Sequence, residues 1–418
     1  MNDIKTVSVI GLGYIGLPTS AVIAHRGVHV IGVDVNQATV DTINSGKIHI
    51  VEPELDVMVR DVVKVGHLRA VTTPEASDVF MIAVPTPFKG SNHVPDLSYV
   101  KSAVLSIAPV LKKGDLVILE STSPVGTTQS MAEWLSAARK DLKFPGDVSI
   151  AYCPERVLPG RIIEELTKND RVIGGMTPQC AERAKALYQL FVKGECVLTD
   201  SATAEMCKLT ENSFRDVNIA FANELSMICD KFGINVWELV RLANRHPRVN
   251  ILQPGPGVGG HCIAVDPWFI VDSAPREARL IRTAREVNDY KPHAVIDQIA
   301  EAAKHFKKPT IACFGLAFKA NVDDLRESPA LEITKHLAEK RIGTVLAVEP
   351  HVSVLPKGLE KATLVSAEEA MKRADILVIL VDHKAFFTLD WAGAKQPIID
   401  TRGITSTVSV ATPALKAC

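Results

Sequence analysis

Residues 255–267 read GPGVGGHCIAVDP, which places Cys262 in a run rich in glycine and proline and Asp266 four residues later. A glycine-rich loop lets the chain pass close to a ligand and exposes a thiol, whereas inert cysteines usually lie inside apolar elements. A thiol adds to an aldehyde to form a tetrahedral adduct, which can then be oxidised to the level of an acid. The loop therefore predicts that Cys262 is a nucleophile, and a structural cysteine is the alternative.

Three further segments carry polar side chains where a ligand could lie. Lys208 and Asn212 are four residues apart in a predicted helix, so they share one face, and a solvated polar stripe is the alternative. VPTPF with Pro85 and Thr86, and STSPVGTT with Thr122, each follow a predicted strand. Doubly wound sheets bind ligands beyond the carboxyl ends of their strands, so both loops are expected at the site. The alternative is that the prolines stop the strands and the hydroxyl side chains cap the next helices.

The first forty residues carry a pattern typical of dinucleotide binding. TVSVI (6–10) predicts a strand, GLGYIG (11–16) follows as G-x-G-x-x-G, and LPTSAVIAHR predicts a helix that ends at Gly27. VHVIGV then predicts a second strand, which is followed by Asp34. The glycines let the backbone approach a pyrophosphate, and the carboxylate suits a ribose 2′-hydroxyl and repels a 2′-phosphate. The pattern predicts NAD rather than NADP, with a simple packing turn as the alternative.

The remaining hydrophobic pattern predicts the elements that must position these residues. Further strands of a doubly wound parallel sheet are predicted at VFMIAV (79–84), LVILEST (116–122), VSIAYC (148–153), RVIGG (171–175) and CVLT (196–199). From about Ser201 long helices follow, one ending at Gly233 and the next opening with the capping-box pair Asn235 and Glu238. Past residue 300 a second α/β block follows: PTIACFGLAF, a helix opening at Ser328-Pro329, GTVLAVEP, DILVIL and PIID.

We therefore predict an α/β protein with two Rossmann-like doubly wound domains joined by a central helical domain, with boundaries at 1–200, 201–300 and 301–418. The first turn of the second block, GLAFK, lacks the G-x-G-x-x-G spacing, so a second dinucleotide is not expected there. Lys319, Arg326 and Arg402 near its strand ends would instead suit another phosphate-bearing group, because arginine holds oxygens in a bidentate fork. Solvated surface side chains are the alternative.

Composition limits the classes of partner and compartment. The 47 basic and 48 acidic residues give a net charge of -1, which provides no electrostatic reason to expect nucleic acid or an anionic membrane. The uncharged run 7–24 contains three glycines and a proline, so it fits neither a membrane span nor a signal peptide. Eight scattered cysteines without metal-ligand spacing predict reduced thiols in the cytoplasm and no metal site.

Seven motifs spaced along essentially the whole chain resemble those of the nucleotide-sugar 6-dehydrogenases, the UDP-glucose dehydrogenase group: GLGYIGLP, VPTP, STSPVGTT, CPE, AEMCKLTENSFRDVNIAFANE, GPGVGGHC with its trailing Asp, and GLAFKANVDDLRESPA. Within this family, CPERVLPG and GGHCIAVDPWF look like the branch that acts on UDP-N-acetyl-D-mannosamine. Members that act on UDP-glucose typically show an acid at the place of Pro159 and a lysine at the place of Val265. UDP-N-acetylglucosamine is the close alternative, and UDP-glucose is a more distant one.

The resemblance implies a four-electron oxidation of the sugar C6 alcohol to a uronate. A base, either Asp266 or a water beside Lys208, takes the hydroxyl proton in the first oxidation, and Cys262 adds to the resulting aldehyde. Oxidation of this thiohemiacetal gives a thioester, and a water oriented by Glu155, Thr122 and Asp266 hydrolyses it. Two NADH are expected for each sugar.

The resemblance also implies binding residues and partners. Lys208 and Asn212 would stabilise the oxyanion. NAD contacts are implied at Gly11, Gly13, Tyr14, Ile15, Gly16, Asp34, Pro85, Thr86 and Thr122. Contacts to the UDP-sugar are implied at Arg156, Val157, Lys208, Asn212, Arg215, His246, Arg248, Gly257, Gly259, Phe318, Lys319 and Arg326. A homodimer built on the central helices is implied, with Arg248 reaching the substrate of the neighbouring subunit.

Two other functions remain as alternatives. A two-electron hydroxy-acid dehydrogenase of similar build would need no cysteine and would give one NADH per substrate. A non-catalytic nucleotide or redox sensor would bind NAD without turnover. The cysteine-bearing loop and the Lys208/Asn212 pair favour the four-electron dehydrogenase over both.

Overall fold

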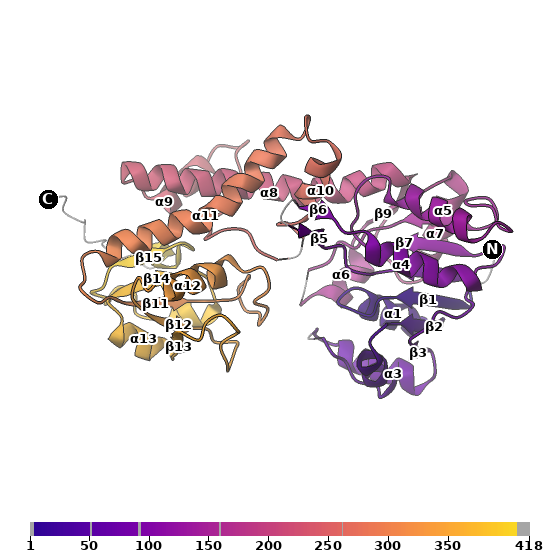
Figure 1. Cartoon of the computed structure of the whole chain (residues 1–418), viewed down its shortest axis with the longest axis horizontal. Coiled ribbons are helices and arrows are strands. Elements are labelled where there is room, and N and C mark those ends of the chain that lie inside the picture. Colours follow the sequence, from indigo (N-terminus) through magenta and orange to yellow (C-terminus); the bar gives the residue numbers. More distant parts are fainter. Residues whose placement is uncertain (1–3, 51, 91–92, 159, 261, 408–418) are drawn as a thin grey trace. The chain divides into compact units, whose positions relative to one another are not determined.

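The structure is a computed structural model that describes residues 4–50, 52–90, 93–158, 160–260 and 262–407 (Figure 1). The chain forms two compact units, one of residues 1–211 with 272–274 and the other of residues 212–271 with 275–418. Each unit contains its own twisted sheet with helices on both faces. Among the described residues, none of the helices combines the length and apolarity needed to cross a lipid bilayer.

The first unit is built on an eight-stranded sheet with strand order β10-β9-β8-β7-β4-β1-β2-β3. Its strands are β1 (Thr6–Ile10), β2 (His29–Val33), β3 (Leu68–Val71), β4 (Val79–Ile82), β7 (Leu116–Leu119), β8 (Ser149–Tyr152), β9 (Arg171–Gly175) and β10 (Cys196–Asp200). Its helices are α1 (Gly16–His25), α2 (Gln37–Asn44), α3 (Leu55–Lys64), α4 (Ser98–Ile107), α5 (Thr127–Ala138), α6 (Ile162–Lys168) and α7 (Pro178–Tyr188). A short hairpin joins β5 (Phe88–Lys89) to β6 (Val94–Pro95).

The buried strands of this sheet contribute side chains to two separate hydrophobic cores. Along β4, Val79 and Met81 belong to the core covered by α1, α3 and α7, whereas Phe80 and Ile82 belong to the core covered by α4 and α5. Side chains alternate between the faces of a strand, so a strand covered on both sides reads as a continuous apolar run. This is why VFMI was recognisable as a buried strand.

The second unit contains a five-stranded parallel sheet with strand order β13-β12-β11-β14-β15 (Figure 1). Its strands are β11 (Thr310–Phe314), β12 (Thr344–Val348), β13 (Ala362–Leu364), β14 (Ile376–Ile379) and β15 (Ile398–Asp400). Its helices are α9 (Val236–Ala243), most of α10 (Asp266–Ser273), α11 (Arg279–Ala303), α12 (Pro329–Glu339), α13 (Ala367–Arg373) and α14 (Ile404–Thr407). Helices α11 and α12 cover one face, and α13 covers the other.

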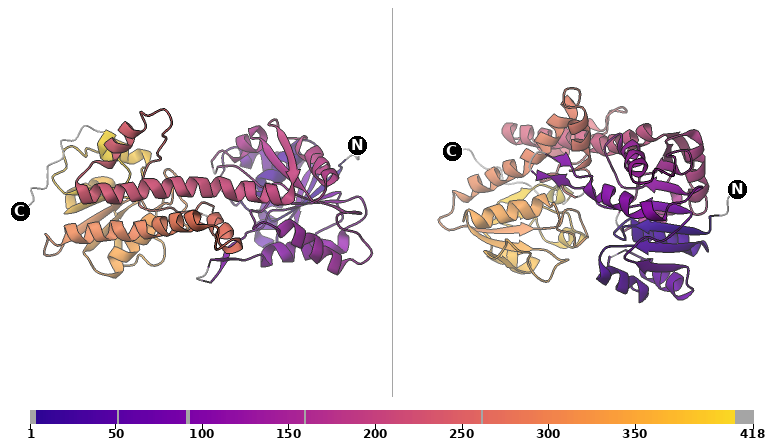
Figure 2. Two further views of the ribbon diagram at one scale, coloured as in Figure 1. Left: turned by 90° about the horizontal axis from the view of Figure 1, so that it is seen from above. Right: turned by 45° about the vertical axis from the view of Figure 1, so that its right-hand side comes forward.

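The long helix α8 (Ser201–Phe232) begins in the first unit and continues into the second. Its second half lies beside α11, as both views in Figure 2 show, and the contact between the two helices is polar and buried. Asp216 on α8 and Arg285 on α11 form an ion pair in which both side chains are at most 1% exposed. Phe214, Phe221 and Phe232 on α8 are instead more than half exposed.

The predicted fold class is confirmed, and the predicted ends of α1 and α8 lie where expected. Gly27 and Gly233 follow these helices with φ values of +86° and +65°, which glycine adopts without a steric penalty. Asn235 caps α9 by accepting hydrogen bonds from the amides of Trp237 and Glu238. The three predicted domain boundaries stay a prediction.

One part of the fold prediction was wrong. The N-terminal sheet is not parallel throughout, because β8 and β9 pair antiparallel. An apolar run carries no information on strand direction, and two neighbouring antiparallel strands need no crossover helix. The pattern also missed the short strands β3 and β13 and the β5–β6 hairpin.

Candidate active site

The glycine-rich turn after β1 meets the end of β4 where strand order reverses. Gly11 has φ +93°, and a Cβ there would lie 2.5 Å from the Ala83 carbonyl oxygen. A Cβ on Gly16, at the start of α1, would lie only 1.8 Å from the Gly11 carbonyl oxygen. A Cβ on Gly13 would meet no protein atom within 4 Å. Gly11 and Gly16 are therefore required by the fold itself, whereas Gly13 leaves room for a ligand close to the backbone.

Asp34 ties the second strand to this turn. One carboxylate oxygen accepts the Leu12 amide at 3.1 Å, and the other accepts the Asn36 amide at 2.9 Å. A carboxylate has about four acceptor positions, so both oxygens keep capacity for ribose hydroxyls. The turn, the amino end of α1 and Asp34 together fit NAD, whose bound nicotinamide would accept a hydride.

The loops after β4 and β7 bind one another at the carboxyl edge of the sheet. The Ser121 hydroxyl bridges the Val84 amide and carbonyl, at 3.0 and 2.7 Å. The Thr86 hydroxyl donates to the Thr122 carbonyl oxygen at 2.7 Å. Pro85, Thr86 and Thr122 are thus brought to one place beside the glycine-rich turn. The Thr122 carbonyl oxygen thus joins the two loops, and α5 begins after Gly126 without a side-chain cap, so Thr122 does not cap this helix.

Glu155 lies just after β8 and is held by a buried arginine. Its carboxylate accepts a 2.7 Å hydrogen bond from Arg171 Nη1, and both side chains are almost fully buried. Its other oxygen accepts the amide of Arg156 at 2.6 Å. Sequence reasoning missed Arg171, because an arginine at the start of a strand gives no signal that it turns inward.

A second buried acid, Glu120, follows β7 beside this pair. Tyr188 donates its hydroxyl proton to Glu120 at 2.8 Å. The pKa of Glu120 is raised to about 8, chiefly by burial and also by the nearby Glu155, while Arg171 opposes the shift. Glu120 is therefore largely a neutral acid at pH 7, next to an ionised pair.

Cys262 differs from the other described cysteines by its exposure. Cys153, Cys180, Cys229 and Cys313 are buried, whereas Cys262 is exposed. Burial raises the pKa of both Cys153 and Cys313 to about 12, so these thiols are inert packing groups. Cys262 lies in the exposed turn that leads into α10, outside any helix or strand, as the sequence predicts. Cys418 lies outside the described residues.

Asn212 on α8 binds the acid that follows Cys262. Its Nδ2 donates to Asp266 Oδ2 at 2.5 Å, and both side chains are buried. The Asp266 amide in turn donates to the Cys262 carbonyl oxygen at 2.9 Å, which closes the turn. A buried, hydrogen-bonded Asn212 is not part of a solvated stripe, so that alternative was wrong for Asn212. One amide proton of Asn212 is used by Asp266, and the second stays available for an oxyanion.

The glycines of the cysteine loop lie against the segment 318–329 of the same unit. A Cβ on Gly257 would lie 2.9 Å from Pro329, and one on Gly259 would lie 2.2 Å from the Glu327 carbonyl oxygen. A Cβ on Gly260 would lie 3.1 Å from the Phe318 ring. Close approach to protein therefore explains these glycines without a ligand. Their backbone contacts to substrate stay a prediction.

The predicted basic residues of the substrate site are in part already paired. Arg156 bonds Glu211, Arg326 holds Asp324 through two nitrogens, and Arg402 bonds Asp382. A phosphate that binds such an arginine must compete with its carboxylate partner. Four further predicted contacts are exposed: Arg215, His246, Arg248 and Lys319. Val157 packs against the first hydrophobic core, and Pro159 lies outside the described residues.

The second sheet carries an acid at the position that corresponds to Asp34. Glu349 follows β12 and accepts the amides of Leu316 and Ala317 and the Nε2 proton of His383. His351 lies beside them, so three potential metal ligands are close together. The Asn321 amide donates to His383 Nδ1 at 2.9 Å, which leaves the proton on Nε2. Glu349 thus stabilises the GLAFK turn through hydrogen bonds. A metal ion bound at His383 Nε2 would require this nitrogen to lose its proton.

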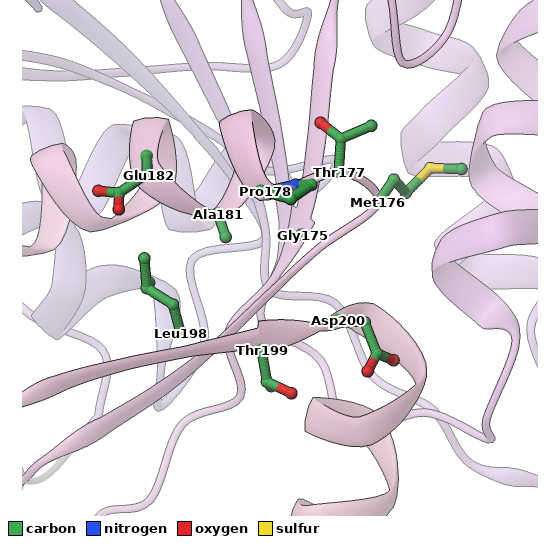
Figure 3. A pocket seen from close by; sticks show the side chains of 9 residues that line it. All are labelled: Gly175, Met176, Thr177, Pro178, Ala181, Glu182, Leu198, Thr199 and Asp200. Carbon is green, nitrogen blue, oxygen red and sulfur yellow. The ribbon is translucent and has the colours of Figure 1, made fainter.

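A hollow of about 310 Å³ lies at the edge of the first sheet, between the start of α7 and the ends of β9 and β10 (Figure 3). Its lining residues are Gly175, Met176, Thr177, Pro178, Ala181, Glu182, Leu198, Thr199 and Asp200. Thr177 caps α7, and Asp200 accepts the Thr203 amide at the start of α8. Since none of the predicted site residues lines this hollow, it is not the candidate active site.

The sequence matches models of three domains of one family. Residues 5–192 match the NAD binding domain of the UDP-glucose/GDP-mannose dehydrogenase family, residues 202–290 match its central domain, and residues 312–407 match its UDP binding domain. The chain belongs to the UDP-glucose/GDP-mannose dehydrogenase family. It is a dehydrogenase with an NAD-binding domain and a UDP-binding domain, as the motifs predicted.

Relatives within the family cover nearly the whole chain. The chain is 64% identical over 98% of both lengths to the NDP-N-acetyl-D-galactosaminuronic acid dehydrogenase of Ralstonia nicotianae. It is 63% identical, over 96% of its length and 99% of the relative's, to the UDP-N-acetyl-D-mannosamine dehydrogenase of Escherichia coli. The solved UDP-N-acetylmannosamine dehydrogenase of Pyrococcus horikoshii is 41% identical, with a TM-score of 0.88 over 96% of each chain.

Proposed function

We propose that this chain oxidises the C6 alcohol of UDP-N-acetyl-D-mannosamine to UDP-N-acetyl-D-mannosaminuronate, with two NADH formed per sugar. The observation that carries the proposal is Cys262, the exposed thiol of a glycine-rich loop, four residues before a buried acid that Asn212 holds. Relatives with 63% identity and this activity in their names support the substrate. We also propose that the reaction takes place in the cytoplasm, where thiols stay reduced.

The proposed reaction begins with removal of the C6 hydroxyl proton and ends with hydrolysis of a thioester. Asp266, or a water beside Lys208, takes the C6 hydroxyl proton during the first oxidation. The Cys262 thiolate then adds to the aldehyde carbon, the carbonyl oxygen takes up a proton, and a thiohemiacetal forms. After the second oxidation this adduct is a thioester. Water adds to its carbonyl carbon, the carbon–sulfur bond breaks, and the uronate and free thiol are released.

Each remaining site residue has a proposed task in these steps. Lys208 and Asn212 stabilise the negative oxygen of the tetrahedral states, which can contribute roughly 3 kcal/mol to a barrier. Glu155 and Thr122 orient the hydrolytic water. Arg171 donates a buried hydrogen bond to Glu155, which fixes the position of that carboxylate. Cys262 and Asn212 belong to the second compact unit, and Lys208, Glu155 and Thr122 belong to the first.

The identity of the sugar is the most specific part of the proposal. The name of the Ralstonia relative supports a second candidate, an N-acetylgalactosamine nucleotide, at nearly the same identity. UDP-N-acetylglucosamine and UDP-glucose remain the alternatives raised by the motifs. Epimers carry the same polar groups and differ only in the direction of a hydroxyl or amide, so discrimination depends on positions within the bound pocket.

A parallel assay of these four nucleotide sugars tests the proposal. We expect UDP-N-acetyl-D-mannosamine to give the highest kcat/KM, with two NADH and one new carboxylate per sugar, measured by absorbance and mass spectrometry. UDP-glucose should react at least about 100-fold less efficiently, because a site that hydrogen-bonds the N-acetyl group is left with unpaired groups. A preference for any other sugar of the four contradicts the assignment, and a yield of one NADH contradicts the four-electron reaction.

We further propose three domains with the boundaries given above and a homodimer through α8, in which Arg248 reaches the neighbouring subunit's substrate. Phe214, Phe221, Ile228 and Phe232 on this helix are 45–68% exposed, which is unusual for side chains of this size on one element. A paired copy of the same helix would cover them, since a twofold interface uses the same surface on both subunits.

Phe221→Glu is expected to weaken dimerisation by about 2 kcal/mol or more, since it places two unpaired charges at a self-complementary interface. Sedimentation velocity over a concentration series measures the change. Val354→Glu is the matched control, because Val354 is also strongly exposed but lies outside α8. If both variants sediment like the parent protein, α8 is not the interface.

A further inference from the structure

A buried polar stripe runs along the face of α8 that carries Asn212. Asp216 and Asn223 lie four and eleven residues further along the helix, which turns them by only about 40° and 20° from Asn212. All three side chains are buried: Asp216 and Asn223 are 0% exposed and Asn212 is 7% exposed. Buried polar groups of this kind need partners, and the partners of Asn223 lead to the cysteine loop.

Asn223 binds the first part of that loop. Its Oδ1 accepts the backbone amide of Gly255 at 2.8 Å. Its Nδ2 donates to Asn288 Oδ1 on α11 at 2.9 Å, which fixes the direction of the side-chain amide. Asn288 is fixed in turn by donating to Asp216 Oδ1 at 2.8 Å, and Arg285 pairs with the same carboxylate. The acceptor for Gly255 is therefore held by a chain of buried hydrogen bonds between two helices.

The same face of α8 binds the chain again after Cys262. Asn212 holds Asp266, and the distance from Asn212 to Asn223 along the helix axis is about 16 Å. The twelve residues from Gly255 to Asp266 thus start and end on one rigid helix. Between these points the loop forms neither a helix nor a strand over its described residues, and its glycines lie on the segment 318–329.

We propose that Asn223 is a positioning residue for Cys262, and that Asn223 and Asn212 form a two-point clamp that holds the nucleophile's loop on α8. This inference rests on the proposed function, in which Cys262 Sγ must reach the sugar C6. Asn223 is fully buried, so in this proposal it contacts neither sugar nor cofactor. It acts through the Gly255 amide, because a buried backbone N–H keeps its loop in place only while its acceptor is there.

Asn223→Ala and Asn288→Ala form a matched pair for the test. Both remove a fully buried amide of the same network, but only Asn223→Ala removes the acceptor of the Gly255 amide. In the full-length protein we expect Asn223→Ala to lower kcat about 100-fold, since small misplacements of a reacting group have effects of this size. KM for NAD and for the UDP-sugar should stay within about threefold. Asn288→Ala should lower kcat by less than about tenfold.

Hydrogen exchange measured by mass spectrometry gives a second reading that needs no catalysis. The wild-type peptide that contains Gly255 should be protected about 1,000-fold over an unstructured chain, and Asn223→Ala should remove most of that protection. Equal losses of kcat in the two variants, or a wild-type peptide protected less than about tenfold, overturn the clamp. Failure of the proposed function would show separately, as full oxidation by a Cys262→Ala enzyme with the exchange results unchanged.

Discussion

Cys262→Ala is expected to abolish formation of the uronate while the protein stays folded. In the proposed reaction the thiol is the only group that converts the aldehyde into an oxidisable tetrahedral adduct, so the loss in kcat for complete oxidation should be at least about 1,000-fold. The exposed side chain contributes little packing, so the free energy of unfolding should change by less than about 1 kcal/mol. Product analysis by mass spectrometry and thermal denaturation measure the two effects.

Cys196→Ala serves as the control for this experiment. Cys196 is partly exposed at the start of β10 and takes no part in the proposed site, so kcat should stay close to the parental value. Full oxidation by the Cys262→Ala protein would contradict the covalent mechanism and favour a two-electron dehydrogenase. Equal losses in the two variants would point to general damage from removing a thiol.

Gly16→Ala is expected to destabilise the first unit by about 3 kcal/mol or more. The new Cβ would lie 1.8 Å from a backbone oxygen, so the turn and the start of α1 must move apart in a fully buried region. A change of this size corresponds to a melting transition lower by roughly 6 to 12 °C for a unit of this length. Differential scanning calorimetry measures it, and NAD titration followed by fluorescence measures binding in the folded fraction.

Gly13→Ala tests the role of the same turn in NAD binding separately from its role in folding. Its Cβ meets no protein atom within 4 Å, so the melting transition should stay within about 2 °C of the parent. The same methyl group would stand where the backbone must approach the pyrophosphate, so NAD affinity should fall at least about tenfold. Unchanged NAD affinity in Gly13→Ala would show that this turn is only a packing feature, which is the alternative that the sequence left open.

The position of Cys262 illustrates how far sequence reasoning reached at the site. Its exposure and the nearby acid were predictable, because glycine content and spacing are local properties. The reason for the glycines was not predictable in full. Gly257 and Gly259 were expected to make room for a ligand, and the structure shows that their Cα atoms lie against Pro329 and the Glu327 carbonyl. Both explanations require glycine, so the sequence alone does not separate them.

The sequence by itself determined the two α/β blocks, the long central helices and the NAD-binding turn with Asp34, because each depends on residues close together along the chain. Only the tertiary structure decided that β9 runs against β8, that Arg171 holds Glu155, and that α8 binds both ends of the cysteine loop. These contacts join residues 16 to 54 positions apart. A buried polar side chain is stabilised by whichever partner the fold brings to it, and neither spacing nor hydrophobic period carries that information.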